Sequence, residues 1–193
     1  MAIAALLGGA APAQQLGRKD FQHLMDAAVS AGAATAQAGT RTICVQRELE
    51  LPLDVSKQRT ADTHQAGLPG LPILPPRSAQ QDPGVEQAYA VALGPRAAVA
   101  SETEIATIAA PYIPYSSKAI PARCAIDPHW ASTGSAAEHV TRVRLSRPVL
   151  ANGFAFVGQV TECSGLCGSG WLRVFRKDHG KWKQVAVRNL FIS

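Results

Sequence analysis

The sequence has few charged residues, few aromatic residues and no long apolar run. Charged residues make up 17% of the 193 residues and aromatic residues 6%, whereas apolar residues make up 47%. This apolar fraction is typical of globular proteins and argues against a disordered chain. No apolar run reaches the roughly 18 residues that a membrane-spanning helix needs, which excludes a protein with several such helices. At about 150 residues per domain, the length predicts one domain.

Familiar catalytic motifs are also missing. The sequence contains no G-x-S-x-G, H-E-x-x-H, S-x-x-K or phosphate-loop pattern, and its five histidines stand apart from one another. Glu138 and His139 are adjacent, but neighbours on a strand point to opposite faces of a sheet. The sequence therefore predicts no catalytic residue, no metal-binding residue and no cofactor.

The first 13 residues carry no charge and have the apolar character of a secretory signal peptide. Residues 11–13, Ala-Pro-Ala before Gln14, have the A-x-A form of a cleavage site. The usual preceding basic residues are missing, because the first one is Arg18. The alternative is an apolar helix, which two glycines and a proline disfavour. We therefore predict an exported protein, periplasmic or secreted, whose single mature domain spans residues 14–193 without a transmembrane segment.

Four cysteines occur in the chain, and an even number in an exported protein predicts two disulfides. Four cysteines allow three pairings. We favour a local bridge between Cys163 and Cys167 together with a bridge between Cys44 and Cys124. The alternative is that some of them are buried free thiols.

Positive charge is concentrated near the C-terminus. Residues 141–193 carry nine Lys or Arg and two acidic residues, a net charge of +7. Residues 14–140 carry ten Lys or Arg and twelve acidic residues, a net charge of −2. Strands that bury one face carry their charges on the other, which explains the excess without a nucleic-acid partner. We therefore expect an envelope partner or a small ligand rather than nucleic acid.

The N-terminal part of the mature chain predicts a helix and then a strand. Residues 20–36 place apolar side chains at i, i+3, i+4 and i+8, with Asp20 as the N-cap and Gly39 as the stop. Residues 41–51 alternate between apolar and polar side chains, which predicts a half-buried strand that joins an edge of the sheet.

The middle of the chain has weaker patterns. Residues 56–84 form an excursion rich in proline and glycine, because four prolines and two glycines occur within one run of twelve residues. Two helices are predicted after it, at 85–92 and 102–110. Ser101 and Glu104 have the spacing of a capping box for the second helix.

The last third of the sequence predicts four strands, at 139–146, 154–163, 170–176 and 181–190. Turn sequences that contain glycine lie between the first two strands and between the last two. The short connections predict an antiparallel meander. We expect four apolar residues of the last strand to share one face: Trp182, Ala186, Leu190 and Ile192. The fold class is therefore α+β, with the N-terminal helix packed on an antiparallel sheet formed mainly by this four-stranded C-terminal meander.

An unusual loop connects the second and third predicted strands. Its sequence is ECSGLCGSGW, and it contains the five candidate binding residues: Cys163, Cys167, Gly168, Gly170 and Trp171. A disulfide-pinned, glycine-rich turn is the structural interpretation, and glycine amides that cup an anion are another. A zinc site would need a second pair of ligands, and a redox site would need a C-x2-C pair at a helix N-terminus.

The same region resembles a group of uncharacterised exported bacterial proteins. Their C-terminal pattern is C-x2-L-C-G-x-G, then G-x-W-x-V, then an aromatic residue followed by Ile-Ser. This chain has CSGLCGSG at 163–170, GKWKQV at 180–185 and FIS at 191–193. It departs from the pattern in Gln184 before the valine and in Phe191, where tryptophan is commoner. The resemblance implies a shared C-terminal fold unit and no particular activity.

Two function classes follow from these observations. The first is a non-enzymatic binding or structural domain of the bacterial envelope. The second is a small metal- or thiol-dependent enzyme that uses Cys163 and Cys167. The first is favoured, because no nucleophile–base pair and no complete ligand set is visible. The oxidation state of the two cysteines distinguishes the two classes.

Overall fold

The computed structural model describes residues 15–34, 42–52, 84–92, 97–126, 140–163 and 167–192. At Cys167, Phe191 and Ile192 the backbone alone is described. The predicted signal peptide, the predicted helix stop at Gly39 and nearly all of the proline-rich excursion lie outside these residues.

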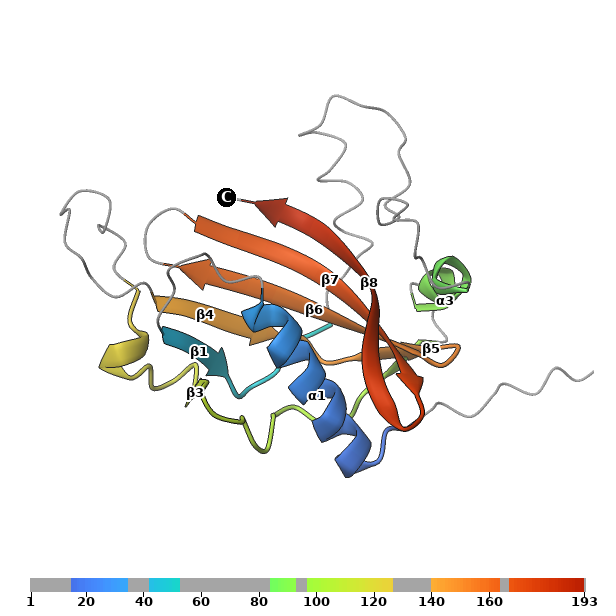
Figure 1. Cartoon of the computed structure of the whole chain (residues 1–193), viewed down its shortest axis with the longest axis horizontal. Coiled ribbons are helices and arrows are strands. Elements are labelled where there is room, and N and C mark those ends of the chain that lie inside the picture. The colour runs from blue at the N-terminus through green and yellow to red at the C-terminus, as the bar shows by residue number, and fades with distance from the viewer. Residues whose placement is uncertain are drawn as a thin grey trace, which may run out of the picture.

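Within the described residues, the strands form one mixed sheet of eight, shown in Figure 1. Strand β6 (Phe154–Cys163) is central, and β7 (Cys167–Asp178) pairs with one of its edges. Strands β4 (Val140–Leu145) and β5 (Val149–Ala151) follow one another along the other edge. Strand β8 (Lys181–Ile192) pairs with β7 and is the last strand on that side of the described sheet.

Strands β4, β6, β7 and β8 confirm the predicted antiparallel meander. Two hairpin turns hold residues with positive φ: Asn152 (49°) and Gly153 (79°) before β6, and His179 (46°) and Gly180 (77°) before β8. Turns of two residues with positive φ match the right-handed twist of the flanking strands. The Asn-Gly and His-Gly pairs therefore produce tight hairpins where the sequence predicts them.

A bulge at Ser146 separates β4 from β5. The Ser146 backbone N–H donates to the Gly158 carbonyl at 2.8 Å, and the Gly158 N–H donates to the Ser146 hydroxyl oxygen at 2.9 Å. The side chain therefore satisfies a backbone donor that the bulge would otherwise leave unpaired. Strand β2 (Ala98–Val99) pairs antiparallel with β5 beyond the bulge.

Strand β1 (Thr42–Gln46) corrects two predictions. It joins the β4 edge of the meander, as predicted, but it runs parallel to β4 on one side and parallel to β3 (Ile113–Tyr115) on the other. The sheet is therefore mixed and not purely antiparallel. Nor is β1 half-buried, since its last three residues are all buried. The alternating pattern cannot reveal that a distant segment covers the more polar face of the strand.

Helix α1 (Arg18–Ala33) packs across one face of the sheet, which we call the inner face (Figure 1). Its apolar stripe is buried against β4 and β6, as its spacing predicts. The predicted cap is wrong, because the helix begins earlier and its N-cap is Gly17, which makes no side-chain cap. Asp20 lies in the first turn, where its charge suits the helix dipole, and it accepts a hydrogen bond from Lys177 at 2.7 Å.

Helix α3 (Val85–Ala92) confirms the predicted helix at 85–92 and packs on the opposite face, which we call the outer face. Successive side chains of a strand alternate between faces. Ala155 and Val157 of β6 therefore join the inner cluster with α1, and Phe154 and Phe156 join the outer cluster with α3.

The helix predicted at 102–110 is absent from the structure, in which this whole segment is described. The backbone of Glu104 forms an isolated antiparallel β-bridge with that of Glu48, and the Ile105 N–H donates to the Arg47 carbonyl at 2.9 Å. The hydroxyl of Ser101 donates to the neighbouring Glu102 and does not cap a helix. The backbone groups that a helix would use are engaged with the chain that follows β1, a long-range pairing that the local pattern cannot reveal.

Strand β8 also differs from its prediction. Its register against β7 shifts at two places, between Gly170 and Trp171 and between Val174 and Phe175. A bulge moves the following side chains to the other face of the sheet. Trp182 therefore packs with the inner cluster, whereas Ala186 and Leu190 pack with the outer cluster.

Candidate functional site

The five candidate residues of the sequence do not form one site. Strand β7 already begins at Cys167, so both candidate glycines are strand residues and not part of a loop. In the β6–β7 ladder Gly168 faces Glu162 and Gly170 faces Val160, which places them on the outer face, and Trp171 lies on the inner face. The alternation of the strand therefore divides the predicted set between two faces.

The two cysteines at this hairpin lie directly opposite each other, because Cys163 pairs with Cys167 in the ladder. Cys163 is disulfide-bonded. The side chain of Cys167 lies outside the described part of the chain, so the Cys163–Cys167 bridge stays a prediction. Its position at the first rung of the hairpin agrees with a turn held by a disulfide.

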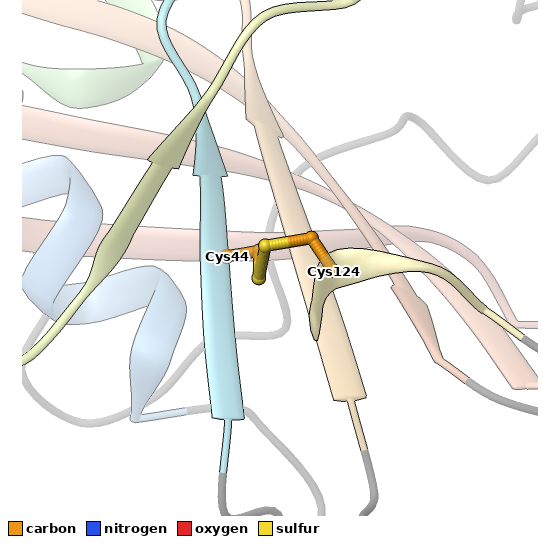
Figure 2. Close-up of a disulfide and its surroundings, with 2 residues drawn as sticks. All are labelled: Cys44 and Cys124. Carbon is orange, nitrogen blue, oxygen red and sulfur yellow. A yellow bond between two sulfur atoms is a disulfide. The ribbon is translucent and has the colours of Figure 1, made fainter. Parts of the chain in front are cut away.

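The disulfide between Cys44 and Cys124 confirms the second predicted pair (Figure 2). It joins β1 to the short 3-10 helix η1 (Ala122–Cys124), and both cysteines are completely buried. Their Cα atoms lie 5.9 Å apart, and 80 positions separate them in the sequence. With Tyr115 and Val140 they form a small cluster on the outer face. The disulfide therefore fastens a long, otherwise irregular segment to the sheet.

A polar cluster interrupts the apolar inner face beside the end of α1. Its centre is Arg173 of β7, whose exposed fraction is 2%. The Arg173 Nε–H donates to Oε1 of Gln159, and Nη1 donates to Oε1 of Gln184 at 2.7 Å. Nε2 of Gln159 in turn donates to the Thr161 hydroxyl oxygen at 2.8 Å. A chain of hydrogen bonds therefore crosses strands β6, β7 and β8. We call these hydrogen-bonded residues, together with the neighbouring Trp171, Ser169 and Asn189, the Arg173 cluster.

Burial controls the electrostatics of Arg173. It lowers the pKa of the guanidinium to about 10, because the charged form loses hydration. Arg173 is nevertheless protonated at neutral pH, since that pKa lies well above 7. The guanidinium carbon lies 6.0 Å from the centre of the Trp171 ring, a cation–π distance. The amide oxygens of Gln159 and Gln184 position the guanidinium.

The rim of the cluster is more exposed than its centre. Trp171 and Asn189 are partly exposed, Gln184 is exposed, and the Trp171 indole N–H donates to the Ser169 hydroxyl oxygen at 2.9 Å. Asn189 faces Trp171 across the β7–β8 ladder. Its Nδ2 atom is buried and has no hydrogen-bond acceptor among the described residues. Such an orphan donor is uncommon in a folded protein.

Gly32, near the end of α1, lets the helix lie close to this cluster. A Cβ atom at Gly32 would stand 3.1 Å from Cδ and Nε2 of Gln159. Only a residue without a side chain therefore fits between the helix and Gln159 without displacing one of them.

A second ionic cluster lies on the outer face. Arg144 bridges two carboxylates, Glu50 and Glu162, the latter at 2.6 Å, and Arg142 binds Glu162 at 3.0 Å. Burial raises the pKa of the nearby Tyr115 to about 12, with smaller opposing contributions from these arginines and carboxylates. The charges of the two arginines and two glutamates balance, although the Nε atoms of Arg142 and Arg144 are buried without a hydrogen-bond partner among the described residues.

A groove of about 460 Å³ lies between the start of α1 and residues 101–106. Its lining contains charges of both signs, from Arg18, Arg47, Glu102 and Glu104. Arg47 there donates to the Ala106 carbonyl at 3.2 Å and so ties the chain segments together. The groove is less convincing as a binding site than the Arg173 cluster, because its arginines lie at the surface.

The described residues contain no group of three or more His, Cys, Asp or Glu that could hold a metal ion. No helix in the described part of the chain is both long and apolar enough to cross a membrane. His179 is 96% exposed at the tip of the β7–β8 hairpin, where its Nε2 lies 3.5 Å from Asp178.

Sequence reasoning missed the Arg173 cluster, although a signal was present. The inner positions of β6 are Ala155, Val157, Gln159 and Thr161, so the apolar series becomes polar halfway along the strand. Arg173 occupies an inner position of β7 between two aromatic residues. Polar side chains on the buried face of a strand indicate a structured network or a site.

No family model, no curated protein and no solved structure matches this chain. The resemblance of the C-terminal pattern to exported bacterial proteins therefore stays a prediction.

Proposed function

We propose that this protein is an exported binding domain of the bacterial envelope, which holds a small ligand or a partner at the Arg173 cluster and catalyses no reaction. The observation that carries the proposal is the gradient of exposure at this cluster. Arg173 is 2% exposed, whereas Trp171 and Asn189 at the rim are partly exposed and Gln184 is exposed. A buried charge below a partly open aromatic and amide rim is typical of a recognition site.

The chemistry of the cluster supports binding rather than catalysis. Its members are a guanidinium, three amides, two hydroxyls and an indole. General acid–base catalysis needs a group that titrates near the working pH, and the pKa of Arg173 is about 10. The cluster can therefore donate and accept hydrogen bonds, but none of its described members is suited to transfer a proton at neutral pH.

The Cys44–Cys124 disulfide supports export. It is completely buried and joins segments that lie 80 positions apart. Structural disulfides of this kind persist in oxidising compartments such as the periplasm and the extracellular space. The apolar N-terminus with its A-x-A sequence agrees with this location.

The alternative function, a metal- or thiol-dependent enzyme built on Cys163 and Cys167, gains no support from the described residues. Cys163 is disulfide-bonded, and a sulfur in that state is neither a nucleophile nor a metal-binding thiolate. We therefore propose one function only.

The proposal is tested by a nitrogen-15 NMR screen of the folded, oxidised protein with a set of small neutral, cationic and anionic organic fragments. We expect at least one fragment to shift the indole signal of Trp171, which a Trp171→Phe variant assigns. Trp182 is an internal control, because its indole N–H donates to the Asp20 carbonyl at 3.2 Å, away from the rim. Shifts that avoid Trp171, or no saturable shift with any fragment, would overturn the proposal.

A further inference from the structure

We infer that the edge of β8 that faces away from β7, which we call the β8 edge, binds an extended segment of another protein as an additional strand, and that acidic and apolar side chains alternate in this segment. In this mode of recognition, main-chain hydrogen bonds provide affinity and alternate side chains provide specificity. The inference goes beyond the proposed function, because it concerns the backbone edge of β8 and not the side chains of the Arg173 cluster.

The ends of the described sheet differ in length and in sequence. Strand β3 ends one side with three residues, one of which is Pro114, and β2 is only two residues long. Short strands and proline keep an edge from accepting another strand. Strand β8 has 12 residues and contains no proline, and β7 is its only partner among the described strands. Within the described sheet, the β8 edge is therefore the end that is long enough to receive a further strand.

The hairpin shows which backbone groups of β8 lie at this edge. Asp178 and Lys181 are paired and flank a two-residue turn, so they form a hydrogen-bonded pair of the ladder. Backbone groups alternate along a strand between its two sides. The N–H and C=O groups of Trp182 and Gln184 therefore point away from β7. In the described sheet no strand pairs with β8 on that side.

Strand β8 is accessible along its described length. Each residue from Lys181 to Leu190 is exposed or partly exposed, whereas seven of the ten residues of the central strand β6 are buried. Figure 1 shows β8 as the outermost strand beyond β7, with its hairpin beside the start of α1. The described part of the chain therefore leaves β8 accessible to a partner.

The charges of the hairpin specify acidic side chains in the partner. Residues 176–193 contain five Lys or Arg and one acidic residue, Asp178. Lys181 and Lys183 lie two positions apart, so they share a face of β8, and both are exposed. Asp178 binds Lys183 at 2.5 Å, whereas Lys181 has no ion pair among the described residues. Acidic residues at alternate positions of an added strand would face these two lysines, an arrangement that stabilises neighbouring strands.

The opposite face of β8 specifies apolar side chains between the acidic ones. Trp182 lies on that face, packs against the inner cluster and is partly exposed. An apolar side chain of an added strand next to Trp182 would cover some of the exposed ring surface and gain the free energy of its burial. Because side chains alternate between faces along a strand, acidic and apolar residues have to alternate in the partner.

A second copy of this chain is a poor partner for the β8 edge. Its β8 would bring Lys181, Lys183 and Arg188 and no acidic residue. Lysine on an edge strand is a common protection against pairing between copies of a protein. Like charges on neighbouring strands are destabilising, so the basic residues that oppose self-association favour an acidic segment instead.

The test compares two end-blocked peptides of about nine residues, one that alternates glutamate with valine and one that alternates lysine with valine. Each is titrated into the folded, oxidised protein while the backbone amide signals of β8 are followed by nitrogen-15 NMR. We expect saturable shifts in β8 with the glutamate peptide and an affinity for the lysine peptide that is at least about tenfold weaker. Hydrogen exchange of the Trp182 and Gln184 amides should slow more than about tenfold at saturation, because an added strand would accept from both.

Two double variants complete the test, and each replaces two exposed basic residues by glutamate. Lys181→Glu with Lys183→Glu reverses the charge at the β8 edge. We expect it to weaken binding of the glutamate peptide at least about tenfold and to strengthen binding of the lysine peptide. The matched control, Lys118→Glu with Arg123→Glu, changes the net charge equally near β3 and in η1, at the other end of the sheet. It should change either affinity less than about threefold, because salt screens distant charges.

The opposite results would each overturn the inference. No saturable shift with either peptide, equal affinity for the two peptides, or equal effects of the two double variants would show that β8 does not select an acidic segment. Shifts without slower exchange of the Trp182 and Gln184 amides would show that the peptide adds no strand. Self-association of the protein alone in a sedimentation experiment would assign the β8 edge to a second copy. Binding at the Arg173 cluster is judged separately, by the Trp171 indole signal.

Discussion

The two faces of the sheet each hold an arginine cluster, and the clusters differ in depth and in partners. On the outer face Arg144 is 30% exposed and binds two carboxylates. On the inner face Arg173 is 2% exposed and binds two amides. An arginine with carboxylate partners forms a closed, neutral unit that links strands. An arginine positioned by amides inside the fold is instead buried together with its charge, which costs free energy of desolvation.

The faces are also held in different ways. A disulfide fastens the outer face at η1, whereas α1 covers the inner face through an apolar stripe without a covalent link among the described residues. A change to either attachment should therefore affect the two clusters unequally. The three predictions that follow use this difference, in order of decreasing effect.

The largest effect is expected from removing the outer-face disulfide. Replacing both Cys44 and Cys124 by alanine should lower the free energy of unfolding by about 4–5 kcal/mol, because the bridge closes a loop of about 80 residues in the unfolded chain. Urea unfolding measures the loss, and the Trp171 indole signal should keep its position in the folded variant.

The matched control replaces Cys163 and Cys167 by alanine. The predicted bridge there closes a loop of about five residues, so the loss should be about 2 kcal/mol. Equal losses in the two double variants would show that loop closure does not explain the role of the Cys44–Cys124 bridge.

An intermediate effect is expected from Gly32→Val on the inner face. The added Cβ would lie 3.1 Å from Gln159, whose side chain is held by Thr161 and Arg173. We expect a loss of about 1–3 kcal/mol and a shifted Trp171 signal, because either the helix or the cluster has to move.

Gly17→Val is the control for this substitution, since a Cβ there meets no atom within 4 Å. Its loss in urea unfolding should stay below about 1 kcal/mol, and its Trp171 signal should be that of the parent protein. The close contact with Gln159 is unimportant if the two variants behave alike.

The smallest effect is expected at Glu48, next to β1. A hydrogen bond from the Ser116 hydroxyl lowers the pKa of this carboxyl, and the Ser117 N–H at 3.0 Å contributes in the same direction. A carboxyl whose pKa is lowered by folding stabilises the protein above its unfolded pKa of 4.5 and loses this contribution as the pH falls through the folded pKa. Glu48→Gln should therefore cost about 1 kcal/mol at pH 7.

Urea unfolding at pH 7 and at pH 3 checks this expectation. The difference between Glu48→Gln and the parent protein should shrink toward zero at the lower pH, and Ser116→Ala should show the same trend. A difference that is as large at pH 3 as at pH 7 would contradict the assigned hydrogen bonds. The Arg173 cluster, whose named members include no carboxyl group, should keep its Trp171 signal while the fold persists.

Local patterns were enough to predict α1, α3 and the meander. The apolar spacing of 20–36 and 85–92 and the turns at 152–153 and 179–180 act over a few residues, so the sequence contains their full signal. The pattern of 102–110 was misleading, because Glu104 and Ile105 pair instead with residues 47–48. A pairing over more than 50 residues leaves no local trace.

The candidate site shows the same limit. The cysteines and glycines of 163–170 are conspicuous in the sequence, but the alternation of β7 places Gly168 and Gly170 on the face opposite to Trp171. The Arg173 cluster is inconspicuous, because Gln159, Arg173 and Asn189 come from three strands. Only the register of the ladder brings them together.

The sequence by itself determined the local elements, the even number of cysteines and the positive C-terminal third, since each depends on residue type and short spacing. The tertiary structure alone decided the parallel placement of β1, the faces of the residues in β8 and the burial of Arg173. The physical reason is that strand pairing and bulges act between distant segments, and one shift of register exchanges the two faces of a sheet.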